Sequence, residues 1–149
     1  MRKTEVVVLV ALGLIVLGLT MVGCGSRNTG NSGINGNWTA TLKNADGSIV
    51  YQFSATLTPG TGNTLNVSNL NVANSGQCLS SSEAASGSFI PTNAQFGMSM
   101  VGFAILSPDL SLQGELSGST ISGTWTLSGG GIAACAGNGT FTMQPSMAD

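Results

Sequence analysis

Apolar and polar residues alternate along most of the chain after residue 35, which is the pattern of β-strands with one buried face. From residue 49 to residue 57, polar Gln52, Ser54 and Thr56 lie on one face. The opposite face is apolar: Ile49, Tyr51, Phe53, Ala55 and Leu57. Residues 36–42 alternate in the same way, and the intervening residues 44–47, Asn-Ala-Asp-Gly, have the composition of a tight turn. The two segments together predict a β-hairpin.

Further alternating segments follow at hairpin spacing, separated by Gly, Pro, Asn and Ser: 65–72, 87–90, 96–106, 110–116, 121–127 and 139–143. In the first of them the alternation slips at Ser68-Asn69, as a β-bulge would cause. The segments amount to about eight short strands, and no stretch has helical periodicity. We therefore predict an all-β domain over residues 36–145, either a single antiparallel β-sandwich or a meander barrel, with residues 146–149 as a short tail.

The first 35 residues do not alternate. Arg2 and Lys3 precede an apolar run over residues 6–19, and Met21-Val22-Gly23-Cys24 follows it. A charged start, a short apolar core and small residues before the cleavage point are typical of an export signal. A retained transmembrane helix needs about 20 apolar residues, and this run is at the lower limit. We expect residues 1–23 to be a cleaved signal peptide and residues 24–35, which begin with Cys24 and are rich in Gly, Ser and Asn, to include a flexible linker.

The end of this segment resembles the lipobox of bacterial lipoproteins, in which the residue after the cleavage point is a cysteine. The resemblance implies that the thiol of Cys24 receives a diacylglycerol group, that fatty acids such as palmitate anchor the mature protein, and that it lies in the cell envelope. Gly25 occupies the position where an Asp would suggest retention in an inner membrane. The resemblance therefore favours the outer membrane, if the cell has one.

Charged residues are scarce, at 7% of the chain. The segment after residue 23 has two positive side chains, Arg27 and Lys43, and five carboxylates, a net charge of −3. Such a chain has no basic surface to neutralise phosphates, which argues against a nucleic-acid partner. The 126 residues left after signal removal suffice for one domain with one core.

Two cysteines remain if Cys24 carries lipid. In an oxidising compartment, a disulfide between Cys78 and Cys135 is the default expectation. Closing a loop of this length stabilises a fold by roughly 4 kcal/mol in the chain-entropy model. A reactive thiol is the alternative, but the chain has no histidine, and Lys43 is the only lysine after the signal, so no evident group would lower a thiol pKa.

One local motif occurs three times: Gly36-Asn37-Trp38, Gly123-Thr124-Trp125 and Gly139-Thr140-Phe141. A glycine two residues before an aromatic residue in a strand permits close backbone approach beside the ring. The first copy resembles the Gly-x-Trp start of lipocalin-like barrels, in which the Trp fills the closed end. The β domain as a whole resembles small Gly/Ser/Thr-rich bacterial lipoproteins, a resemblance that carries no known activity.

The residues that carry chemistry are few. Without histidine, the chain lacks the commonest general base and transition-metal ligand. Asp109 and Glu115 are the one pair of carboxylates that could serve glycoside hydrolysis, but Asp109 follows Pro108 in a turn and Glu115 lies on a polar strand face. Asp46 lies in a turn that lacks the further ligands of a calcium loop. We therefore expect no enzyme activity, no cofactor and no metal.

The most apolar segment after the signal offers one candidate ligand site. Its side chains would adapt to a small apolar ligand: Phe96, Met98, Met100 and Phe103. A central strand buried on both faces gives the same pattern. We expect a lipid-anchored envelope β module with a binding or structural role. The sequence leaves open whether its partner is a protein, a glycan or a small apolar ligand. The alternatives are a lipocalin-like carrier and an envelope glycoside hydrolase.

Overall fold

Eight antiparallel strands form a closed β-barrel in a computed structural model that describes residues 33–74, 78–81, 83–102 and 107–146. Each strand pairs with the next, and β8 returns to pair with β1. This confirms the predicted all-β fold and, of the two architectures that alternation allows, selects the meander barrel. The strands are β1 (Gly36–Lys43), β2 (Ile49–Pro59), β3 (Thr64–Asn74), β4 (Ala84–Ile90), β5 (Gln95–Val101), β6 (Asp109–Ser117), β7 (Thr120–Leu127) and β8 (Gly137–Pro145).

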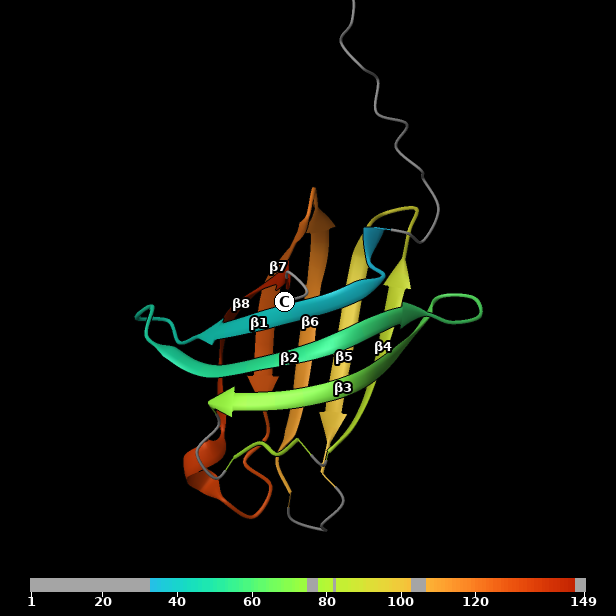
Figure 1. Ribbon diagram of the computed structural model, residues 1–149. Helices are drawn as coiled ribbons and strands as arrows, with labels where there is room; N and C mark the ends of the chain where they lie inside the picture. Colours follow the sequence, from blue (N-terminus) through green and yellow to red (C-terminus); the bar gives the residue numbers. More distant parts are fainter. Residues whose placement is uncertain (1–32, 75–77, 82, 103–106, 147–149) are drawn as a thin grey trace, which may run out of the picture.

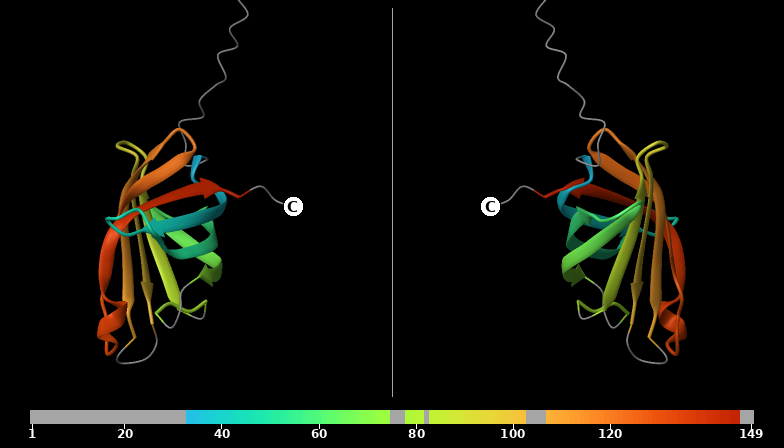
Figure 2. Two further views of the ribbon diagram at one scale, coloured as in Figure 1. Left: turned by 90° about the vertical axis from the view of Figure 1, so that its left-hand side faces the viewer. Right: turned by 90° about the vertical axis from the view of Figure 1, so that its right-hand side faces the viewer.

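The barrel is flattened into two layers. Strands β1, β2 and β3 cross in front of β5, β6 and β7 at a steep angle (Figure 1), and the side views show the layers converging at one end (Figure 2). The seam between β3 and β4 is the shortest, because only Thr64–Asn66 pairs with Ser86–Ser88. Beyond Asn66, β3 is paired with β2 alone.

The bulge predicted at Ser68-Asn69 is present. On β2, Ser54 pairs with Asn71 while Thr56 pairs with Ser68, so Asn69 and Leu70 together face one residue of β2. Asn69 takes a left-handed backbone conformation, with φ of 52°, which Asn tolerates better than most residues. β3 therefore contains one extra residue at this point, and bulges of this kind bend the strand locally.

Two strand boundaries differ from the sequence prediction by three residues or more. β4 begins at Ala84, not at Gly87, because Ala84, Ala85 and Ser86 pair with β5 although they lack an apolar alternation. β5 ends at Val101, whereas alternation and hydrophobicity predicted a strand to residue 106; residues 103–106 lie outside the described part of the chain.

The repeated Gly-x-aromatic motif has a cross-strand explanation. In the β7–β8 pair, Gly123 lies opposite Phe141, and Gly139 lies opposite Trp125. Each motif therefore supplies the glycine that makes room for the ring of the other strand. A Cβ on Gly114 of β6 would lie only 3.0 Å from the Phe141 ring, so a third inward glycine extends the same space. In this rank, Gly114 and Gly123 lie side by side between the rings of Phe96 and Phe141.

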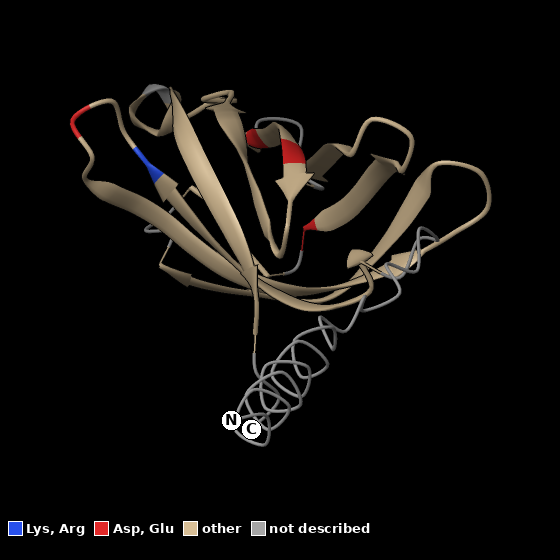
Figure 3. Cartoon of the chain, turned by 90° about the horizontal axis from the view of Figure 1, so that it is seen from above, with Lys and Arg blue, Asp and Glu red and all other residues tan. Residues whose placement is uncertain are grey.

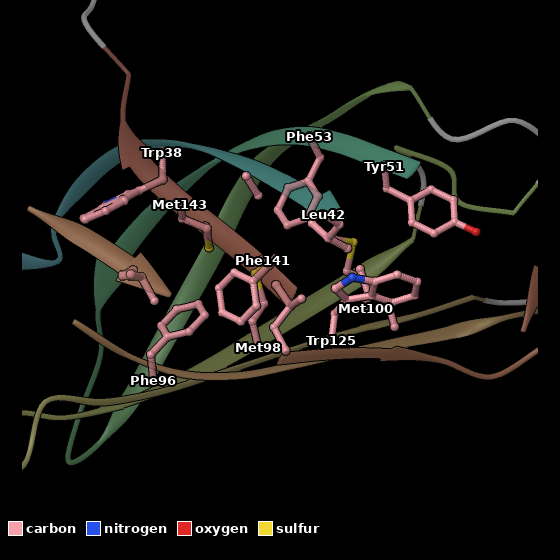
Figure 4. Packing of buried hydrophobic residues seen from close by; sticks show 14 of the residues in the cluster. Trp38, Leu42, Tyr51, Phe53, Phe96, Met98, Met100, Trp125, Phe141 and Met143 are labelled. Carbon is pink, nitrogen blue, oxygen red and sulfur yellow. The ribbon is translucent and has the colours of Figure 1, made fainter. Parts of the chain in front are cut away.

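Aromatic and methionine side chains from both layers fill the barrel interior (Figure 4). At one end, Ile34 is completely buried, and its carbonyl oxygen accepts a 2.9 Å hydrogen bond from the Trp38 indole nitrogen. Ile34, two residues before the first Gly-x-Trp motif, thus covers this end of the core. Fourteen side chains of this buried cluster are drawn in Figure 4.

The opposite end is covered by the connection between β3 and β4. Leu79 is buried in the core, and the backbone N–H of Val72 on β3 donates a 2.9 Å hydrogen bond to Ser81 Oγ, which holds the connection beside the bent strand. Cys78 forms a disulfide with Cys135 of the short 3₁₀ helix η3 (Ala133–Cys135). The expected disulfide is therefore present, and it joins the β3–β4 and β7–β8 connections at one end of the barrel.

Candidate functional site

The side chains predicted to adapt to an apolar ligand face the interior. Phe96, Met98 and Met100 of β5 are each at most 2% exposed. The Phe96 ring lies 6.2 Å from that of Phe141, centroid to centroid, in a tilted arrangement. Phe103 lies outside the described residues. Phe96, Met98 and Met100 therefore belong to the packed core, and they form the buried inward face of β5.

A hollow on the outer face of β4, β5 and β6 is the strongest candidate for a binding site. Strand register arranges its lining in three ranks, each taking one residue from β4, β5 and β6 in turn. The ranks are Ile90, Gln95 and Glu115; Ser88, Gly97 and Gln113; and Ser86, Ser99 and Ser111.

Gly97 occupies the centre of this grid. Its position faces outward, but its backbone is buried because the side chains of Ser88 and Gln113 on the flanking strands lie close to the place that a side chain of its own would occupy. The hollow has two adjoining parts of about 370 and 260 Å³, which share Ser88, Gly97 and Gln113. The three atoms nearest to a Cβ placed on Gly97 would be the Ser88 hydroxyl oxygen, at 2.9 Å, and the Gln113 amide nitrogen and oxygen, at 3.4 and 3.6 Å. The two flanking side chains thus lean over the glycine and form the walls.

The polar side chains of the hollow make no hydrogen bonds with one another or with other described residues: Ser86, Ser88, Gln95, Ser99, Ser111, Gln113 and Glu115. The outer face of β1–β3 is different. There, Thr56 Oγ1 donates to Asn37 Oδ1 at 2.7 Å and accepts a bond from Asn69 Nδ2 at 3.1 Å, while the hydroxyls of Thr39 and Ser146 bond at 2.7 Å. One outer face therefore satisfies much of its own hydrogen-bonding capacity, whereas the hollow leaves this capacity available.

The electrostatic character of the hollow is weakly negative. Glu115 is its one ionisable side chain, and it is exposed. Elsewhere in the described residues, the charges are Lys43 on β1 and the carboxylates Asp46, Glu83 and Asp109 (Figure 3). With no Lys or Arg among its lining residues, the hollow offers no countercharge to an anionic ligand.

Asp109 and Glu115 do not form a catalytic pair in this geometry. Both lie on the outer face of β6, separated by six residues along one strand. At about 3.3 Å per residue, their backbones are about 20 Å apart. Glycosidases place their two carboxyl groups roughly 5–9.5 Å apart. The structure does not bring together the two residues that the hydrolase hypothesis requires.

Glu83, which the sequence did not single out, is a partly buried carboxyl outside the hollow. The backbone N–H of Ser80 donates a 2.9 Å hydrogen bond to its Oε1, while Oε2 is buried without a hydrogen-bond partner among the described residues. Burial raises the pKa of Glu83, and the nearby charge of Asp109 raises it further, although the Ser80 hydrogen bond opposes both. Glu83 is the last residue of the disulfide-linked connection between β3 and β4, and it does not line the hollow.

Sequence reasoning did not find the hollow. Its centre, Gly97, lies between Phe96 and Met98, and these apolar neighbours led to a predicted site on the inward face of the strand. The outward residues of the three strands are each ordinary for an exposed strand face. A glycine on the polar side of a well-alternating strand is a usable signal, because glycine weakens a strand unless something approaches its backbone. Cys24, the predicted lipidation site, lies outside the described residues.

Among the described residues, no group of three or more His, Cys, Asp or Glu side chains is placed to hold a metal ion. In the same part of the chain, no helix has the length and apolar character needed to cross a membrane. Comparisons with protein-family models, with curated proteins and with solved structures found no match to this chain.

Proposed function

We propose that this protein is a lipid-anchored module of the bacterial cell envelope that binds its partner through the outer surface of a rigid β-barrel. The lipobox-like segment ending at Cys24 supports the anchor, and the Gly, Ser and Asn-rich segment after it supports a linker between lipid and barrel. In this proposal the barrel is a scaffold for a surface site and carries out no catalytic step.

The observation that carries the surface assignment is the filled interior. Trp38, Phe53, Trp125, Phe141 and Met143 are all at most 2% exposed and lie together in the core. A carrier of the lipocalin kind needs interior space of the order of its ligand, since ligand pockets commonly measure about 300–1,000 Å³. The described hollows of comparable size open on the outer face instead.

Metabolic labelling tests the anchor. Cells that express the parent chain with an alkyne-tagged palmitate analogue should incorporate the label into the mature protein, which should fractionate with membranes. Cys24→Ser should lose the label and accumulate as an uncleaved or mislocalised precursor. The double variant Cys78→Ser/Cys135→Ser is the matched control, because it removes two thiols but keeps the proposed attachment site. Labelling of Cys24→Ser at the parent level would contradict the proposal.

The carrier alternative has a separate test. Protein purified from cells under mild conditions and extracted with organic solvent should contain no stoichiometric apolar molecule apart from its covalent lipid. Recovery of one such molecule per barrel would instead place the binding site inside.

A further inference from the structure

We propose that the hollow over β4, β5 and β6 is a binding site for a neutral carbohydrate, with room for about two linked sugar rings centred on Gly97. The inference rests on the proposed function and deepens it, since it names the place on the outer surface and the chemistry of what binds there.

The dimensions follow from strand geometry. Outward residues two positions apart on a strand are separated by about 6.7 Å, and neighbouring strands by about 4.8 Å. Three ranks over three strands therefore make a site about 13 Å long and about 10 Å wide. Gly97, which has no side chain, forms its floor, and Ser88 and Gln113 form the walls on either side.

The chemistry of the lining matches hydroxyl groups. Serine hydroxyls and glutamine amides can each donate and accept hydrogen bonds, as sugar hydroxyls do. Gln95 and Gln113 lie in adjacent ranks, so that two amides can contact one ring, while Ser99 and Ser111 lie in the third rank. Glu115 adds an acceptor at one end. Since these side chains have no partners among the described residues, a ligand would exchange only their bonds to water and would break no protein contact.

The charge pattern makes the ligand neutral. A phosphate, sulfate or uronate group would enter a site whose one ionisable group is the Glu115 carboxylate and which has no cation to pair with it. The proposal therefore excludes teichoic-acid-like or phosphorylated glycans as the preferred ligand.

An extended peptide fits the site less well than a sugar. Peptides that add to a sheet do so at an unpaired edge, where the backbone supplies hydrogen bonds. Around the hollow, β5 is paired on both sides, with β4 and with β6. Of the nine grid positions, Ile90 alone has an apolar side chain, so the hollow has no row of pockets for apolar peptide side chains.

Nuclear magnetic resonance titration tests the site, because it detects weak binding and locates it. Full-length, lipid-bearing protein labelled with ¹⁵N is held in a polyoxyethylene detergent, whose headgroup contains no sugar. Cellobiose, maltose and N,N′-diacetylchitobiose are added separately. We expect at least one of them to shift amide signals in a saturable way, with the shifts confined to residues 86–90, 95–99 and 111–115.

Three variants make the assignment specific. Gly97→Thr should weaken binding at least tenfold, because it fills the centre; it should fold, because the added Cβ meets only side-chain ends and Gly97 has no positive φ. Gln113→Ala should also weaken binding about tenfold, because it removes an amide but leaves the hollow open. This variant tests the site independently if Gly97→Thr folds poorly. Thr140→Val on the outer face of β8 is the matched control and should bind within twofold of the parent.

The outcomes separate the two proposals. No saturable shifts with any of the three sugars, or binding that persists in both hollow variants, would overturn the carbohydrate site. Shifts in the hollow caused by the neutral peptide tetra-alanine, with none caused by the sugars, would overturn it in favour of a peptide. If either result is found while the parent chain still incorporates palmitate, only the carbohydrate site is overturned. If the parent chain incorporates no palmitate but binds a sugar in the hollow, only the lipid anchor is overturned.

Discussion

The indole nitrogen of Trp125 on β7 donates a 2.9 Å hydrogen bond to the carbonyl oxygen of Lys43 on β1, across the intervening strand β8. The bond is possible because Gly139 of β8 lies between them without a side chain. A Cβ at Gly139 would collide with the Lys43 carbonyl oxygen and lie 2.8 Å from the indole nitrogen. Tyr51 packs edge-on against the same ring, with centroids 5.6 Å apart, so one buried Trp connects three strands beyond its own.

Gly139→Ala should therefore destabilise the barrel by about 2–3 kcal/mol, because the new methyl group meets a backbone atom that cannot rotate away. Urea denaturation followed by Trp fluorescence measures the change. Gly97→Ala is the matched control, since it adds the same atom to a strand but meets only flexible side-chain ends, and should stay within about 0.5 kcal/mol of the parent. Equal effects of the two substitutions would contradict this reading.

Removal of the Cys78–Cys135 disulfide should lower the free energy of unfolding by about 4 kcal/mol, since the bond closes a loop with a sequence separation of 57. The double variant Cys78→Ser/Cys135→Ser and reduced parent protein should unfold at similar urea concentrations. Hydrogen exchange should rise first in the connection that contains Leu79 and along the part of β3 that pairs with β2 alone. A loss below about 1 kcal/mol would show that the connection stays in place without its covalent link.

The raised pKa of Glu83 predicts a pH dependence with a definite sign. Because the folded state disfavours the ionised carboxyl, the contribution of Glu83 to stability is full below the ordinary pKa of glutamate, about 4.3, and is lost as pH rises through its higher folded-state pKa. Across that window, the free energy of unfolding of the parent should fall relative to that of Glu83→Gln. Asp109→Asn should move the fall to lower pH, because it removes a charge that raises the pKa of Glu83. A parent-to-variant difference that rises with pH would refute the assignment.

Asp109→Asn combined with Glu115→Gln should change stability by at most about 0.5 kcal/mol per site, since both side chains are exposed on one strand. Envelope glycans and simple esters should not be turned over by the parent. Turnover that is lost in the double variant would overturn the prediction and would require a second copy or another group to bring the distant carboxylates together.

Much of this fold could be read from local pattern. Side chains on a strand point alternately to opposite faces, so the period-two run from Ile49 to Leu57 determined both the strand and its buried face without knowledge of its neighbours. The slip at Ser68-Asn69 marked the bulge for the same reason. Cys78 and Cys135 could be paired because the predicted signal and compartment left them as the only two candidates, an argument that needs no coordinates.

Closure of the barrel could not be read in this way. A sandwich and a barrel require the same alternation on each strand, and they differ in whether the first strand pairs with the last. That pairing joins Trp38–Lys43 to Thr140–Pro145, and such long-range contacts leave no periodic signal in either segment. The same limit applies to the purpose of the Gly-x-aromatic motif, which became clear only when register placed Gly139 opposite Trp125.

The hollow is the feature that tertiary structure alone decided. The sequence determined that Ser88, Gly97 and Gln113 lie on polar strand faces, but these residues belong to three strands and their proximity depends on the register of two separate hairpins. A shift of one residue in either pairing would move a side chain from the outer to the inner face. The site therefore exists because long-range packing of the core determines the register, while local alternation determines only which face of each strand is exposed to solvent.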